Sequence, residues 1–365
     1  MSLKKDSYSN FDKNAMKLAI RLAINNNGLT GTNPSVGCVI AKNNRIISYA
    51  ATGINGRPHA ETIAIKNSKD NYKSVIYITL EPCSHYGKTP PCTKTIIKSG
   101  LKKVNFSVSD IDPRSSNKSK KILKANKIIT KSGLLRNEVK KLYKSYSFTK
   151  RYKLPYITGK LACASNFYIL KNRSNITNEH SRKLSHLLRY KNQGIMTSFK
   201  TVNSDNPKLT CRLNGLEKFS PSRFIIDKNL KINMNSFIVN NSKKIKTFVF
   251  HNSKNKEKIK KLKEKGLKLI KQESNINGQI NIKKLFKKIY SLGIHSLLVE
   301  CGKNLTSNIL TEGLFNEFYL FKSNKAIKSL KKINVKNIYK MLNQNYQNKN
   351  NVKTYLDKDI LIHYS

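Results

Sequence analysis

The chain has 365 residues, 38% of them hydrophobic, a length that predicts two domains rather than one. Six scattered cysteines in so long a chain exclude a small disulfide-stapled module and indicate reduced thiols in a cytoplasm. The charged start MSLKKDSYSNFDKNAM has no apolar stretch behind it, and no apolar run reaches the roughly 18 residues of a membrane helix. We therefore expect a cytoplasmic protein without a membrane partner.

The formal net charge of +51 comes mainly from Lys, which is spread along the chain and mixed with Asn and Ile. A nucleic-acid-binding surface would use more Arg and would concentrate the charge on one face. Lys, Asn and Ile share A/T-rich codons, so mutational drift explains the excess without any partner. We expect no nucleic-acid partner, although the charge suits the recruitment of phosphorylated, anionic small molecules.

The first part of the chain predicts a compact domain of strands and helices. Apolar residues at helical spacing follow Asp12, the expected N-cap, and predict a first helix that ends in NNNG. Two strands around an Asn-Asn turn follow in SVGCVIAKNNRIISYA. The next elements are a short helix in HAETIAIKNS, a buried strand in SVIYITL, a helix in CTKTIIKSG closed by Gly100, and a strand in KKVNFSVSD.

A basic, Pro-containing link, KLYKSYSFTKRYKLPYITGKLA, precedes the second part, and we expect domains at 1–148 and 149–365. Beyond the link, strands predicted in GIMTS, RFIID, KTFVFH and SLLVEC alternate with helical patterns at 181–192, 256–266, 282–293 and 304–314. This alternation predicts a mostly parallel, doubly wound α/β sheet. From about residue 325 the Lys- and Asn-rich sequence allows little assignment.

One His and two Cys in the first domain match a catalytic zinc site. Such a site takes three protein ligands and keeps the fourth position for water, and His59, Cys83 and Cys92 supply one imidazole and two thiolates. Cys92 opens a predicted helix, whose N-terminus stabilises a thiolate. Glu61 follows His59 by two residues and is able to carry the proton of the water. A zinc-bound water and a carboxylate that carries its proton are suited to the hydrolytic removal of an amine from an unsaturated ring carbon.

Two other interpretations of these residues are open. They could be one core His and two buried thiols, which are common separately. The order of H-A-E before E-P-C speaks against that coincidence. A purely structural zinc module would need a fourth ligand, and the nearby candidate, His85, lies only two residues after Cys83.

PHAET and TLEPCSHYGKTPPC resemble the signature of the zinc deaminase superfamily, H-x-E followed by P-C-x-x-C. Eight residues separate the two cysteines, whereas nucleic-acid and nucleotide deaminases have two. With NPSVGCVI at 33–40, this spacing resembles the bifunctional deaminase-reductases of riboflavin biosynthesis. The resemblance implies a cytidine-deaminase-like, three-layer α/β/α domain. It would bind Zn²⁺ and hydrolytically deaminate a diaminopyrimidinone ribosyl phosphate. A nucleic-acid-editing deaminase is the alternative.

The eight intervening residues predict a loop over the zinc site. His85, Lys88 and Thr89 are donors suited to a ribose 5-phosphate and a polar pyrimidine, and Asn33, on a turn before a proline, is placed to hydrogen-bond the base. We expect substrate contacts at these positions. Ordinary loop polarity is the alternative explanation for each of them.

The resemblance extends over the second domain, which in the family is a dihydrofolate-reductase-like, doubly wound α/β domain that uses NADPH. TSFKTVNSDNPKLTCR at 197–212 is similar to that domain's signature, and SLLVECGKNLTSNIL predicts a strand, a Gly-containing turn and a helix that suits an anion. The resemblance implies NADP contacts at Cys163, Thr201, Asp205 and Gly302, and substrate contacts at Lys160, Leu209, Arg212 and Glu300.

The second domain also departs from the family pattern. ASNFYI stands where the family has a Ser-Leu-Asp-Gly turn. Asn-Ile-Thr stands in place of Trp-Ile-Thr, and Cys301-Gly302 in place of Gly-Gly. Lys- and Asn-rich sequence replaces a Pro-containing segment after NEFYLF. We expect a bulky Phe167 to obstruct the nicotinamide and reduction to be weak. A deaminase with a non-catalytic second domain is the alternative, and the sequence leaves a homo-oligomer open.

Overall fold

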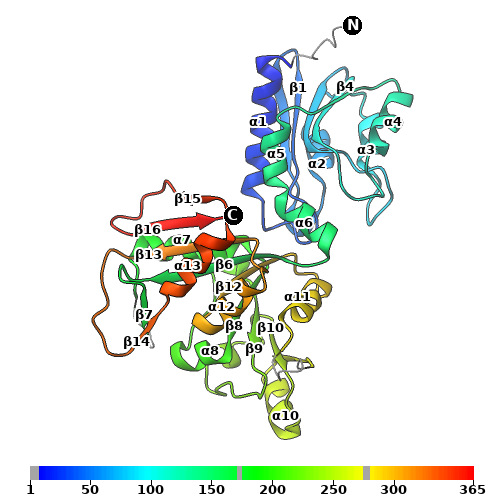
Figure 1. Cartoon of the computed structure of the whole chain (residues 1–365). Coiled ribbons are helices and arrows are strands. Elements are labelled where there is room, and N and C mark those ends of the chain that lie inside the picture. Colours follow the sequence, from blue (N-terminus) through cyan, green and yellow to red (C-terminus); the bar gives the residue numbers. More distant parts are fainter. Residues whose placement is uncertain (1–7, 171–174, 274–279) are drawn as a thin grey trace. The chain divides into compact units, whose positions relative to one another are not determined.

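The computed structural model describes residues 8–170, 175–273 and 280–365 and divides the chain into two compact units, Met1–Lys153 and Leu154–Ser365. Each unit has its own sheet with helices packed on it (Figure 1). The boundary predicted between residues 148 and 149 lies inside a helix, because the basic link continues the helical pattern as α6 (Lys144–Tyr152).

Unit 1 is a three-layer α/β/α domain. Its sheet has the order β2-β1-β3-β4-β5, in which β1 is antiparallel to β2 and β3, while β3, β4 and β5 are parallel. Helices α1 and α5 lie on one side of it, and α2, α3 and α4 lie on the other (Figure 1). The elements are α1 (Asn10–Asn25), β1 (Gly37–Lys42), β2 (Arg45–Ala51), α2 (Ala60–Asn67), β3 (Val75–Leu80), α3 (Cys92–Lys98), β4 (Lys103–Val108), α4 (Lys118–Ala125), β5 (Ile129–Ser132) and α5 (Arg136–Leu142).

The N-cap predicted for the first helix was wrong. Helix α1 is capped by Ser9, whose hydroxyl accepts a hydrogen bond from the Asp12 amide, while the Asp12 carboxylate accepts one from the Ser9 amide. This reciprocal capping box satisfies two donors of the first turn, which a cap at Asp12 alone would not do. The same carboxylate also accepts the hydroxyl of Tyr77 at 2.6 Å and so attaches α1 to β3.

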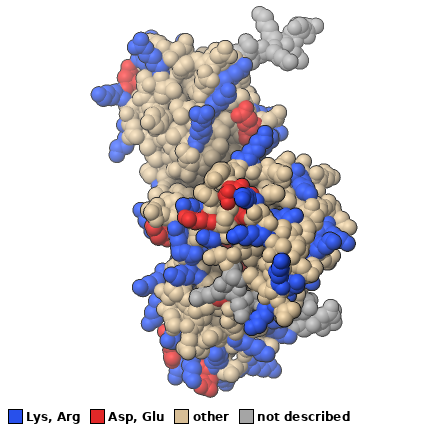
Figure 2. Space-filling model, turned by 90° about the vertical axis from the view of Figure 1, so that its left-hand side faces the viewer, with Lys and Arg blue, Asp and Glu red and all other residues tan. Residues whose placement is uncertain are grey.

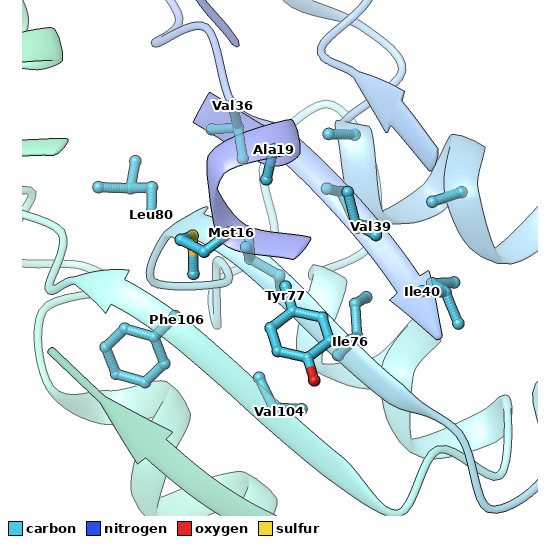
Figure 3. Close-up of a cluster of buried hydrophobic side chains, with 14 of the residues drawn as sticks. Met16, Ala19, Val36, Val39, Ile40, Ile76, Tyr77, Leu80, Val104 and Phe106 are labelled. Atoms are coloured by element: carbon cyan, nitrogen blue, oxygen red, sulfur yellow. The ribbon is translucent and has the colours of Figure 1, made fainter. Parts of the chain in front are cut away.

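Helix α1 lies unusually close to the sheet. Met16 and Ala19 on its buried face pack with Val39 and Phe106 of the strands (Figure 3). A Cβ atom on Gly37 would stand 1.8 Å from the carbonyl oxygen of Ala19. Glycine at position 37 is therefore required for the contact between helix and strand.

Unit 2 is a doubly wound α/β domain with the sheet order β11-β10-β9-β8-β12-β6-β13-β16-β15. The strands from β11 to β13 are parallel, and β16 and β15 are added antiparallel. The strands are β6 (Tyr156–Cys163), β8 (Gly194–Ser198), β9 (Ser222–Ile226), β10 (Thr247–His251), β11 (Lys268–Lys271), β12 (Ser296–Glu300), β13 (Glu317–Lys322), β15 (Lys349–Asn351) and β16 (Ile360–Tyr364). The helices are α7 (Glu179–Lys191), α8 (Phe199–Asp205), α9 (Phe237–Asn240), α10 (Lys256–Glu264), α11 (Ile282–Ser291), α12 (Lys303–Thr311) and α13 (Lys336–Asn345). The predicted fold class is confirmed in both units.

The Lys- and Asn-rich end of the chain is ordered into elements that the sequence did not predict. Strand β14 (Lys332–Asn334) pairs with β7 (Tyr168–Leu170), and α13 buries Ile338 and Leu342. These few apolar side chains are enough to attach the segment to the core of unit 2. Their periodicity is hidden by the polar residues between them.

In Figure 2 basic side chains are scattered over the visible face among uncharged residues and do not gather in one patch. This distribution agrees with the Lys-rich sequence. No helix in the described ranges combines the length and apolar character needed to cross a membrane.

The contact of α1 with β1 gives a first prediction. Gly37→Ala should destabilise unit 1 by about 3 kcal/mol or more, because the added methyl group meets backbone that cannot rotate away. Urea unfolding measures the change. Gly87→Ala is the control, since the nearest atom to its Cβ would be a side-chain nitrogen at 3.5 Å, an ordinary contact. Equal stability of the two variants would contradict the close packing.

Candidate metal centre and reductase pocket

Three side chains of unit 1 meet at the start of two helices. His59 occupies the N-cap position of α2, Cys92 is the first residue of α3, and Cys83 follows β3. Their ligand atoms all lie within 4.8 Å of one another. His59 Nδ1 is 3.2 Å from Cys92 Sγ and 3.6 Å from Cys83 Sγ. One nitrogen and two sulfur donors at these positions fit a zinc ion with an open fourth position.

The surroundings of Cys83 favour a thiolate. The Cys92 thiol, the Cys92 amide at 3.2 Å and His59 lower the pKa of Cys83 to about 4, against the effect of burial. The pKa of Cys92 is raised well above its ordinary value by its hydrogen bond with Cys83 and by burial. A bound divalent cation would favour the deprotonated form of both ligands.

Glu61 lies in the first turn of α2, beside these three ligands but outside the group of converging atoms. Its side chain is buried and reaches the Cys92 thiol. Burial raises the pKa of Glu61, although the charge of His59 opposes the effect. A carboxylate with a raised pKa next to a metal site is suited to accept and return a proton near neutral pH.

The predicted substrate contacts of unit 1 lie on the segments that flank the ligands. The Asn33 side chain donates to the Gly56 carbonyl at 3.0 Å, which attaches it to the segment before His59. His85 Nδ1 is 2.9 Å from the hydroxyl of Ser115. Lys88 and Thr89 are exposed on the loop between the two cysteines. Their roles remain predictions.

Unit 2 contains a pocket of about 1170 Å³ at the carboxyl ends of β6, β8, β9 and β12. Ligands of open α/β sheets bind at this edge. The predicted contacts Lys160, Thr201, Asp205, Leu209, Glu300 and Gly302 all line the pocket. Six of the eight positions implied by the resemblance are thus brought together.

Cys163 and Arg212 are not among the lining residues. The Cys163 side chain is fully buried in the apolar core, and burial raises its pKa to about 11. Arg212 is exposed, and its Nη1 donates a long hydrogen bond to the Thr210 hydroxyl at 3.5 Å. Its charge nevertheless acts on the buried pair of Arg189 and Glu300. We place Arg212 at the rim of the pocket. The side chain of Cys163 does not line the pocket.

A largely buried ionic cluster forms the floor of this pocket. Arg189 on α7 donates two hydrogen bonds to Glu300 on β12, at 2.8 and 2.9 Å, and Lys160 Nζ lies 3.9 Å from the same carboxylate. Burial alone would raise the pKa of Glu300, but the charges of Arg189 and Lys160 hold it at about 2. Arg189 was not among the predicted contacts, because it is one of several basic residues in α7 and the sequence pattern resembles that of an exposed charged helix. Its position in the buried pair makes it a candidate substrate ligand.

The altered turn at 164–169 does not obstruct the pocket. The Phe167 ring packs on Tyr339 of α13, with a centroid distance of 4.7 Å, and Phe167 is not a lining residue. The Asn166 side chain makes hydrogen bonds with both the amide and the carbonyl of Ile327. Ile169 and Ile333, paired between β7 and β14, both line the pocket. The Lys- and Asn-rich segment therefore supplies part of the pocket wall.

Comparisons with known proteins agree with this architecture. Residues 9–108 match the family model of the cytidine and deoxycytidylate deaminase zinc-binding region, and residues 170–327 match that of the RibD C-terminal domain. The riboflavin biosynthesis protein RibD of Aquifex aeolicus is 35% identical over 319 residues, covering 85% of this chain and 86% of that protein. RibD of Bacillus amyloliquefaciens is 33% identical, covering 84% and 82%.

Two solved structures are similar over nearly the whole chain. A diaminohydroxyphosphoribosylaminopyrimidine deaminase/5-amino-6-(5-phosphoribosylamino)uracil reductase from Thermotoga maritima has a TM-score of 0.80 and 27% identity, covering 97% of this chain and 98% of its own. RibD of Acinetobacter baumannii has a TM-score of 0.83 at 24% identity, with the same coverage, and supports the fold.

Fold and site together define a two-domain enzyme, a zinc-type pyrimidine deaminase followed by a reductase. The chain belongs to the RibD family of riboflavin biosynthesis, whose members combine the two activities in one chain. The predicted enzyme class and the predicted cofactors, zinc and NADPH, are confirmed at the level of the family.

The cluster around Glu300 predicts a pH-dependent stability. Its pKa of about 2 lies below the ordinary 4.5, so the carboxylate stabilises unit 2 fully above pH 4.5 and loses this effect as the pH falls towards 2. Glu300→Gln should cost roughly 3 kcal/mol at pH 7, because Arg189 and Lys160 lose their partner. Urea unfolding should show this difference shrinking at pH 3. The exposed Glu312→Gln is the control, and a difference independent of pH would contradict the assignment.

Proposed function

We propose that unit 1 hydrolytically deaminates 2,5-diamino-6-ribosylamino-4(3H)-pyrimidinone 5′-phosphate at a zinc ion held by His59, Cys83 and Cys92. The observation that carries the proposal is the convergence of one imidazole and two thiols within 4.8 Å, with the buried Glu61 beside them. The chemistry of this donor set is that of a catalytic zinc site, and His85 bonds Ser115 instead of joining it as a fourth ligand. This argues against a purely structural module.

When bound there, zinc supplies an activated water. Glu61 takes the proton of that water as the oxygen attacks the amine-bearing ring carbon, and it passes the proton to the ring nitrogen. Glu61 then takes the second proton from the hydroxyl now on that carbon and gives it to the amine, which departs as ammonia, and the ring keeps the oxygen as a carbonyl. Asn33 would orient the base, and His85, Lys88 and Thr89 would hold the ribose phosphate.

Unit 2 would reduce the deaminated product by transferring a hydride from NADPH to C1 of the ribose. The bond from C1 to the ring oxygen breaks, that oxygen takes a proton from solvent, and the sugar becomes an open ribityl chain. We assign Thr201, Asp205 and Gly302 to the cofactor. Lys160, Leu209, Arg189, Arg212 and Glu300 would contact the substrate. Support comes from the pocket, whose lining includes Lys200, Lys228 and Lys303 as cations for the phosphates of the dinucleotide.

The deaminase assignment is tested with Glu61→Gln. Because this change removes the proton carrier and keeps the three ligands, the variant should bind about one zinc per chain while deamination falls about 100-fold or more. Ultraviolet spectra of the pyrimidine follow the reaction, and metal analysis counts the zinc. Cys92→Ser is the contrasting variant and should lose the metal itself. Loss of zinc in Glu61→Gln would instead make Glu61 a ligand.

The reductase assignment is tested by the fall in NADPH absorbance after deamination. We expect weak but measurable reduction, because Cys301-Gly302 stands where the family has Gly-Gly and Cys301 lines the pocket. NADPH should be preferred over NADH because the cationic lining favours the 2′-phosphate. Arg212→Ala should abolish the reduction and leave deamination unchanged, since the two sites lie in different units. The exposed Lys218→Ala on the same loop is the matched control. An absence of NADPH binding would make unit 2 a scaffold and leave a deaminase alone.

A further inference from the structure

The segment that leads into the metal centre carries a cation without an assigned role. Arg57 is half-buried and lies two residues before the ligand His59. Its Nη1 donates a hydrogen bond to the Thr89 hydroxyl, and its Nη2 lies 3.5 Å from the position of a Cβ atom on Gly87. The guanidinium therefore lies along the loop between the two cysteine ligands.

Three other cations in this part of unit 1 have partners. Arg114 and Lys150 share the carboxylate of Asp112, at 2.7 and 3.4 Å, and Lys94 donates to the Tyr86 hydroxyl. Within the part of the chain that the structure describes, Arg57 has no carboxylate within ion-pair distance, and residues 82–95 include no Asp or Glu. The positive charge of Arg57 is thus not neutralised by a carboxylate of the described residues.

The contact between Arg57 and Thr89 also leaves hydrogen-bond donors that can bind an anion. Arg57 has five N–H donors, and a hydroxyl that accepts one of them can still donate its own hydrogen. Thr89 and the remaining donors of Arg57 therefore present adjacent donor groups on one loop, next to the charge of Lys88. Adjacent donors on a planar guanidinium match two oxygens of a phosphate.

We propose that Arg57, together with Thr89, binds the phosphate monoester of the pyrimidine substrate and selects the phosphorylated form for deamination. This inference rests on the proposed function, since the same substrate has to place its ring at the zinc ligands. Arg57 acts as a specificity-determining residue, whereas Glu61 acts on the reacting atoms. A dephosphorylated nucleoside would leave Arg57 without its ligand.

Deamination kinetics of Arg57→Ala with two substrates test the proposal. For the phosphorylated pyrimidine, kcat/KM should fall roughly 10- to 100-fold, the range of hydrogen bonds to a charged group. For the dephosphorylated nucleoside it should stay within about twofold. Arg57→Lys should recover part of the loss, because it restores the charge without the fork. Equal losses with both substrates would show that Arg57 only orders the loop, and no loss with either would also overturn the proposal.

Two controls keep the result interpretable. Lys94→Ala removes a cation that already has a partner near the same loop, and it should leave the ratio of the two substrates unchanged. Zinc content close to one per chain in Arg57→Ala excludes damage to the metal centre.

A binding experiment separates this proposal from the proposed function. Ribose 5-phosphate is titrated by calorimetry into the zinc-loaded full chain carrying Arg212→Ala, which weakens the substrate site assigned to unit 2, and adding Arg57→Ala should weaken the remaining binding about tenfold or more. If the wild type deaminates neither pyrimidine but binds ribose 5-phosphate through Arg57, the proposed reaction fails and the phosphate site stands. Equal binding of ribose 5-phosphate by both proteins overturns the phosphate site.

Discussion

Two backbone amides at the start of α3 hold Cys83, and the geometry of the metal centre depends on this attachment. The Cys92 amide donates to the Cys83 sulfur at 3.2 Å, and the Thr93 amide donates to the Cys83 carbonyl at 3.2 Å. These bonds place the two thiols side by side regardless of the chain between them. The cost of closing a loop rises slowly with its length, so eight intervening residues cost only about 1.2 kcal/mol more than two. The added length gives the loop room for the polar groups that we assign to the substrate.

In unit 2 a cluster of paired charges holds the site together. Glu300, Arg189 and Lys160 come from β12, α7 and β6, and their charges compensate one another where side chains are largely removed from water. Removing one member would leave the others buried without compensation, so the cluster couples the packing of three elements to the shape of the pocket floor. The metal centre is assembled by backbone amides, whereas the reductase pocket is assembled by paired charges.

The sequence predicted those parts of the site that depend on residue identity over a short span. His59, Glu61, Cys83 and Cys92 lie within 34 positions, and the chemistry of zinc restricts which residues serve. Arg189 was missed because its partner Glu300 is 111 residues away and no local pattern joins them. The lysine-rich composition likewise hid the amphipathic pattern of α13, and the reciprocal bond of Ser9 was overlooked in favour of the acidic Asp12. Long-range contacts and compositional bias are thus the two sources of the errors.

The position of β6 within its sheet has a consequence for the order in which the protein is made. Unit 1 is built from one continuous stretch that ends at Lys153, so its fold can form as soon as that stretch leaves the ribosome. Strand β6 comes next in the chain, yet its neighbours β12 and β13 are synthesised more than 130 residues later. At 5–20 residues per second this delay lasts roughly ten seconds, during which an apolar strand lacks both partners. During that interval the deaminase unit would be folded, while the reductase unit that follows it in the chain would still be incomplete.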